Sequence, residues 1–184
     1  MKKLAVFVIA LSIFAVKSQG QIYIADSCRV SFFSAASIEN IAAVTTTSKP
    51  VMSTSTSDFQ ISINNESFIF HKKLMQEHFN EDYMESDKYP HTVFKGKINE
   101  TVDYKKDGTN KVTITGTMDM HGVTKTITIP GTITIKDGLF FLSAKFDVKC
   151  ADYNIKIPSV LGNNIAEQVA VSFNATMKPY QSKK

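Results

Sequence analysis

The chain has 184 residues, 43% of them hydrophobic, with 21 basic and 17 acidic side chains and a formal net charge of +4. Three lysines and no acidic residue fall in the first 20 positions, so residues 21–184 carry a net charge of only +1. A nearly neutral domain lacks the basic surface on which nucleic-acid binding depends, and we expect no nucleic-acid partner.

Residues 1–20 have the pattern of a secretory signal peptide. Two lysines precede an apolar run from Leu4 to Val16, and Gly20 provides a small residue at the expected cleavage point. The run is too short to span a bilayer comfortably, so an uncleaved anchor is the weaker alternative. We expect cleavage near Gly20, no transmembrane anchor afterwards, and one domain formed by residues 21–184.

Alternation of apolar and polar residues begins soon after the signal and predicts a first group of strands. Pro50 interrupts the Thr/Ser-rich stretch Thr45–Ser57, which fits a loop or an edge strand. Three sets of residues share an apolar face in this part of the chain: Ile22, Ile24, Cys28, Val30 and Phe32; Phe59, Ile61 and Ile63; and Phe94, Gly96 and Ile98.

A helical pattern lies between the second and third of these sets. Met75, Phe79 and Tyr83 recur at helical spacing, with Leu74 and His78 beside them. Pro90 then ends any helix. We predict a short amphipathic helix that covers one end of the β-structure.

The second half alternates more strictly. His121-Gly122 and Asp137-Gly138 predict tight turns, and Pro130-Gly131 predicts a bulge or bend. The apolar parity of these strands comprises Val112, Ile114, Gly116, Met118, Met120, Ile127, Ile129, Ile133, Ile135, Phe140, Leu142, Ala144, Phe146, Val148, Val169, Val171, Phe173, Ala175 and Met177.

These faces indicate an all-β protein of about eight antiparallel strands, each with one apolar and one polar side. A closed barrel removes exposed strand edges, although a β-sandwich shares the same alternation. An outer-membrane barrel would need the reverse polarity, with an apolar outside. The pattern therefore favours a barrel with an apolar interior.

The two cysteines, Cys28 and Cys150, allow two interpretations. An exported protein can form one disulfide between them. Both also lie on apolar strand faces, which fits two buried thiols, and the sequence leaves this choice open. No CxxC or Cys/His spacing indicates a metal site. No HExxH, GxSxG or phosphate-binding glycine loop is present, so we expect a protein that is not an enzyme and needs no cofactor.

Three elements of the sequence resemble the YceI-like, polyisoprenoid-binding family. The first combines Leu74–Glu81 with Ser86-Asp87-Lys88-Tyr89-Pro90 and Phe94-Lys95-Gly96. The second is Gly116–Lys125, in which Met118 replaces the family's usual leucine. The third joins Phe146-Asp147-Val148 to Asp152-Tyr153-Asn154-Ile155, in which Asn154 replaces a glycine and would suit a positive φ.

The resemblance implies an eight-stranded antiparallel, lipocalin-like barrel with the short helix capping one end. It also implies a bacterial periplasmic or secreted protein that holds an isoprenoid or fatty amphiphile in an apolar tunnel. The alternative is a filled barrel that acts through a protein partner, and a homodimer is also left open. Ten residues are expected either to line the tunnel or to fill the core: Met75, Phe79, Tyr83, Phe94, Ile114, Met118, Phe140, Phe146, Val171 and Phe173.

Overall fold

The computed structural model describes residues 20–35, 40–156 and 168–181. The predicted signal peptide, apart from Gly20, lies outside the described residues. Within the described part, no helix is long and apolar enough to cross a membrane. The strands are β1 (Ile22–Ser34), β2 (Ile41–Thr45), β3 (Val51–Ser53), β4 (Asp58–Asn64), β5 (Ile69–Phe70), β6 (His91–Ile98), β7 (Gly108–Met120), β8 (Val123–Lys136), β9 (Leu139–Lys149) and β10 (Gln168–Pro179). The helical segments are α1 (Lys73–His78), the π-helix η2 (Phe79–Tyr83) that continues it, and the 3₁₀ turns η1 (Asn65–Ser67) and η3 (Cys150–Tyr153).

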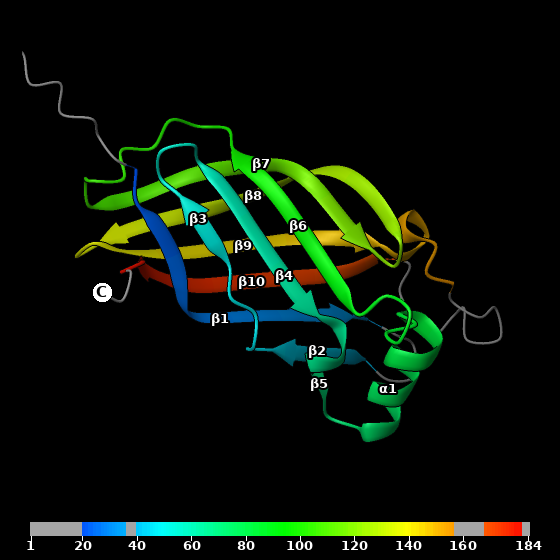
Figure 1. Ribbon diagram of the computed structural model, residues 1–184. Coiled ribbons are helices and arrows are strands. Elements are labelled where there is room, and N and C mark those ends of the chain that lie inside the picture. Colours follow the sequence, from blue (N-terminus) through cyan, green and yellow to red (C-terminus); the bar gives the residue numbers. More distant parts are fainter. Residues whose placement is uncertain (1–19, 36–39, 157–167, 182–184) are drawn as a thin grey trace, which may run out of the picture.

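The strands form one antiparallel sheet that closes on itself where β10 pairs with β1 (Figure 1). β2 and β3 pair with opposite ends of β1, and β5 and β4 pair with β2 and β3 in turn. β2 and β3 together therefore fill one strand position beside β1, and β5 and β4 together fill the next one. The ten segments thus make an eight-stranded barrel. The predicted fold class, including the short helix at one end, is confirmed.

Local sequence explains the two long hairpins. His121 and Asp137 have φ of 52°, and the glycines that follow them have φ of 72° and 74°. Two successive residues with positive φ make the turn whose twist matches that of the flanking strands. Both predicted turns are confirmed. We call the end of the barrel at Asp137-Gly138 the hairpin end, and the end that carries α1 the helix end.

Two predictions about strand regularity are wrong. The β7–β8 ladder runs through Pro130-Gly131 without a shift, so no bulge lies there. A β-bulge occurs instead in β1, where the pairing with β10 shifts between Ala25 and Ser27. The extra residue reverses the parity of the strand before it. Tyr23 is therefore buried at 6% exposure, whereas Ile22, predicted to face inward, is 41% exposed.

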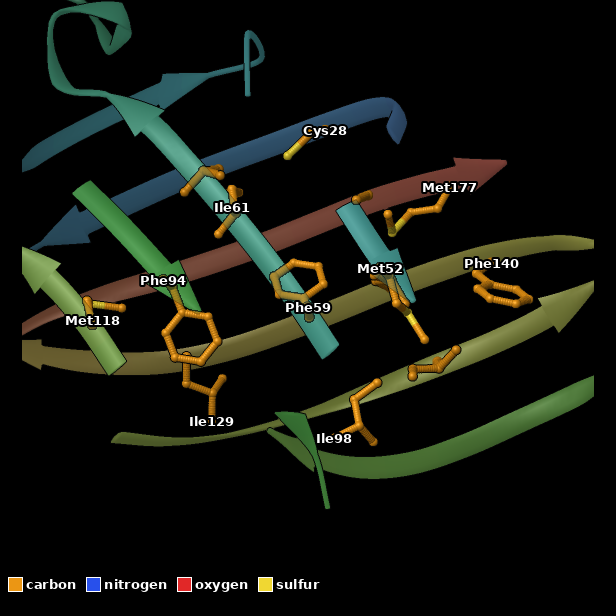
Figure 2. Close-up of a cluster of buried hydrophobic side chains, with 14 of the residues drawn as sticks. Cys28, Met52, Phe59, Ile61, Phe94, Ile98, Met118, Ile129, Phe140 and Met177 are labelled. Atoms are coloured by element: carbon orange, nitrogen blue, oxygen red, sulfur yellow. The ribbon is translucent and has the colours of Figure 1, made fainter. Parts of the chain in front are cut away.

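The core changes character along the barrel axis. Figure 2 shows side chains from facing strands directed into the interior, with Phe140 and Met177 toward one side and Phe94 and Met118 toward the other. At the hairpin end the Tyr23 and Phe140 rings stack with centroids 3.8 Å apart, and Tyr104 lies 5.6 Å from Phe140. These three rings form a solid layer, which we call the aromatic floor.

The disulfide interpretation is wrong, because Cys28 and Cys150 are both free and buried. Cys28 pairs with Ala175 on β10, whereas Cys150 follows the pair of Lys149 with Gln168. Seven residues of β10 separate these two levels, which is about 23 Å of strand. A disulfide needs Cα atoms within about 7 Å.

Candidate ligand cavity

The helix-end part of the barrel is hollow. A cavity of about 490 Å³ lies inside it, and its wall consists almost entirely of aliphatic, methionine and phenylalanine side chains from the strands and from α1 and η2. The strands supply this wall because each places alternate side chains inward. The cavity is therefore a direct consequence of the apolar parity together with side chains too small to fill the interior.

The structure places nine of the ten residues singled out from the sequence on the cavity wall: Met75, Phe79, Tyr83, Phe94, Ile114, Met118, Phe146, Val171 and Phe173. Phe140 instead lies in the aromatic floor and is fully buried there. The reason is its position one residue beyond the start of β9, next to the turn at the hairpin end. Parity gives its direction correctly but says nothing of its height in the barrel.

Four phenylalanines pack together where α1 and η2 meet the cavity wall. The Phe79 ring lies 5.1 Å from Phe70, 5.5 Å from Phe32 and 5.7 Å from Phe68, measured between centroids. We call these four rings the aromatic lid. Leu74, which the sequence placed beside the apolar face formed by Met75, Phe79 and Tyr83, is 62% exposed, because α1 turns this residue toward solvent. Sequence analysis found Phe79 but missed Phe68 and Phe70, which belong to a turn and a two-residue strand without periodicity.

One buried polar residue, Asn65, supports this wall. Its Nδ2 donates to the carbonyl of Tyr89 at 2.7 Å, and its Oδ1 accepts from the Thr92 hydroxyl at 2.9 Å. Its backbone N–H donates to the carbonyl of Pro90 at 2.9 Å. These bonds satisfy the side chain internally, so it fixes the loop before β6 and does not require a polar ligand group.

His121 ties three elements together at the rim of the helix end. Its Nε2 lies 2.9 Å from a Glu85 carboxylate oxygen, and its Nδ1 lies 2.9 Å from the Tyr153 carbonyl oxygen. Both partner atoms are hydrogen-bond acceptors, so each ring nitrogen that carries a hydrogen can donate to one of them. The turn role predicted for His121 is confirmed, and its side chain also joins the β7–β8 hairpin to η3 and to the segment after η2.

A second link crosses the same rim. The Lys125 ammonium donates to a carboxylate oxygen of Asp152 at 2.8 Å. This hydrogen bond, with the charge of Lys125, lowers the pKa of the Asp152 carboxyl. Together with the His121 bonds, it fixes η3, at the end of β9, against the beginning of β8.

The cavity wall is mainly an apolar binding surface. Among the described residues, no group of three or more His, Cys, Asp or Glu side chains could hold a metal ion. Cys150 lines the cavity, and burial raises the pKa of its thiol. Burial also raises the pKa of Cys28 to about 11. Thiols with raised pKa values are poor nucleophiles at neutral pH, because the thiolate is the reactive form.

A closed antiparallel barrel around an apolar cavity defines a lipocalin-like binding protein. The chain belongs to the YceI-like domain family, whose pattern it matches over residues 7–177. The resemblance noted in the sequence is thus confirmed. Among curated proteins, no sequence matches the chain.

Solved structures show the same fold at low identity. A polyisoprenoid-binding domain from Saccharophagus degradans, implicated in plant cell wall breakdown, has a TM-score of 0.75 and 15% identity, covering 86% of this chain and 98% of that one. BcnA from Burkholderia cenocepacia has a TM-score of 0.68 and 16% identity, covering 81% and 95%. The YceI protein of Campylobacter jejuni has a TM-score of 0.51 and 16% identity, covering 98% and 94%.

Proposed function

We propose that this protein is an exported, non-enzymatic carrier that holds the chain of an isoprenoid or similar amphiphile in its barrel. The observation that supports the proposal is the cavity of about 490 Å³ with its apolar wall. Its volume lies within the range of about 300–1,000 Å³ found for small-molecule sites. The family and the polyisoprenoid-binding neighbour agree with a binding role.

Burial of apolar surface would supply the affinity. Each methylene-sized group transferred from water into the cavity gains about 0.8 kcal/mol, so ten such groups would gain roughly 8 kcal/mol before the costs of ordering the ligand. The aromatic floor blocks the hairpin end. The tail would therefore point toward the floor, and the polar head would stay in the helix-end half. A filled barrel that works only through a partner fits poorly with a cavity of this size.

Lipid analysis tests the carrier role. We expect an isoprenoid or fatty amphiphile in the mass spectrum of lipids extracted from protein purified from its own host. We also expect the recombinant protein to bind parinaric acid, a fluorescent fatty acid. Met118→Trp should weaken this binding by filling the cavity, whereas Thr117→Trp, one residue away on the exposed side, should not. Absence of both bound lipid and parinaric acid binding would refute the proposal.

Export is the second part of the proposal, and the pattern of residues 1–20 supports it. N-terminal sequencing of the protein recovered from the host should begin at Gln21. A recovered protein that retains residues 1–20 would contradict cleavage and export in soluble form.

A further inference from the structure

Among the described residues, the ladder between β8 and β9 covers only part of the two strands. β8 and β9 pair only between Gly131–Lys136 and Leu139–Ala144. Beyond this point β8 stays on β7 as far as Val123, and β9 stays on β10 as far as Lys149. Among the described residues, the two facing edges have no backbone partner across the gap. Both strands can be followed from their shared hairpin in Figure 1.

Pro130 explains where the ladder stops. In an antiparallel hairpin with a two-residue turn, the closing pair and every second pair after it exchange hydrogen bonds. Counting from the pair Lys136–Leu139, the residue on β8 that should bond next after Thr132 is Pro130. Proline has no N–H to donate. The opening is therefore encoded in the sequence, at the site where a bulge was predicted.

Side-chain contacts at the rim of the helix end bound the unpaired stretch on its far side. The ion pair of Lys125 with Asp152 and the bond from His121 to the Tyr153 carbonyl join the start of β8 to η3. The gap is thus framed by two strand edges, by the last ladder pair and by the rim contacts. We call it the window. From Lys125 to Gly131 it extends over six residues of β8, which is about 20 Å.

The cavity reaches the window. Thr132 and Ser143 form a ladder pair next to the window. Their sequence neighbours face inward, so their own side chains should face outward, yet both residues border the cavity. The last inward pair, Gly131 and Ala144, has almost no side chain to obstruct the passage, and a Cβ on Gly131 would lie 2.7 Å from the Ser143 carbonyl oxygen. The partly exposed side chain of Phe146 lies farther along on β9 and also lines the cavity.

Among the described residues, aromatic rings pack together at both ends of the barrel. Tyr23, Tyr104 and Phe140 form the floor at the hairpin end, and the four rings of the lid pack together at the helix end. Moving either layer requires several buried aromatic rings to separate, whereas the window lacks even the backbone hydrogen bonds of a closed wall.

We propose that the window is the route by which the apolar chain of the ligand enters and leaves the barrel sideways. This inference rests on the proposed carrier function. The apolar cavity wall behind the window favours a hydrocarbon chain as its occupant. A peptide that adds a strand to the open edges is the competing occupant, and its pairing would not require exchange with the cavity.

A reversible bridge across the window tests the proposal. Thr128→Cys on β8 and Asp147→Cys on β9 change exposed residues on its two edges. They are joined by a bis-maleimide linker with a disulfide in its middle, which a reductant opens. The matched control is Thr134→Cys with Phe141→Cys, a pair on the same strands within the intact ladder. Wild type treated with the linker controls for the native thiols, whose burial and raised pKa values disfavour labelling.

Stopped-flow fluorescence then measures the association and dissociation of parinaric acid. We expect the bridged window to slow both rate constants by at least about tenfold, with little change in Kd, because a blocked path raises one barrier for both directions. Reduction of the linker should restore the rates, and this restoration separates bridging from misfolding. The bridged control pair should exchange like wild type.

Two results would overturn the proposal, and they are distinguishable. Unchanged rates in the bridged window variant, with normal parinaric acid binding, would refute the window and leave the carrier function intact. The same result is expected if the occupant of the window is a peptide that adds a strand to its edges. Failure of the wild-type protein to bind parinaric acid would refute the carrier function and the window together.

Pro130→Thr is an independent variant. It restores the missing N–H donor on β8 and should slow exchange severalfold, in the same direction as the bridge.

Discussion

Replacing Phe140 by alanine tests the aromatic floor. The ring is fully buried and stacks on Tyr23 with an interplanar angle of 11°. A buried Phe→Ala change costs about 3–5 kcal/mol, and the lost aromatic pairs add about 0.5–1.5 kcal/mol each where they are not already counted. We therefore expect Phe140→Ala to lower the free energy of unfolding by about 4 kcal/mol.

The neighbouring residue supplies the control. Phe141 belongs to the same strand and carries the same side chain, but it faces outward and is 40% exposed. Phe141→Ala should change the stability by no more than about 1 kcal/mol. The comparison removes differences in residue type and strand position and leaves only the face of the sheet.

Thermal melting followed by circular dichroism measures both variants. A domain of this size loses about 2–4 °C of Tm per kcal/mol, so Phe140→Ala should melt about 8–16 °C below wild type. Chemical denaturation should give the same order of the three proteins. Equal losses in the two variants, or a larger loss for Phe141→Ala, would show that the register of β9 or the packed floor is wrong.

Three further predictions follow from the lid, the thiols and the rim. Phe79→Asp should abolish parinaric acid binding, whereas Leu74→Asp on the exposed side of α1 should retain it; equal binding by both variants would remove the lid from the site. Without reductant, alkylation followed by mass spectrometry should label neither Cys28 nor Cys150 in the folded protein and should label both in denaturant. Denatured protein that takes up no label would indicate a disulfide between them. Asp152→Asn should lower Tm at neutral pH, because a carboxyl whose pKa is lowered in the folded state stabilises the fold above its unfolded pKa. This contribution is lost as the pH falls through the folded pKa, so the Tm difference from wild type should shrink on acidification. A difference that grows instead would contradict the ion pair.

Local patterns in the sequence were sufficient for the strands of the second half and for the helix. Alternation along β7, β9 and β10 depends only on the two-residue period of a strand, and Gly122 and Gly138 mark turns because they readily take a positive φ. The αL conformation of Asn154, with φ of 55°, also agrees with its replacement of a family glycine. The same rule misjudged Ile22, because a bulge is one inserted residue without a clear sequence signal.

The sequence by itself determined which side chains share a face within each unbroken stretch of strand, since parity is a local property of the strand. Only the tertiary structure decided closure into a barrel, the height of each inward residue along the axis and the division of the interior into a floor and a cavity. These features depend on which strands pair, how far they are staggered and how the summed side-chain volumes fill the space. Phe140 and Phe146 show the difference, since they share one face of β9, yet one packs in the floor and the other lines the cavity. Pro130 shows it too: the sequence marked an irregularity, but the effect on the β8–β9 ladder follows only from the pairing of the two hairpins.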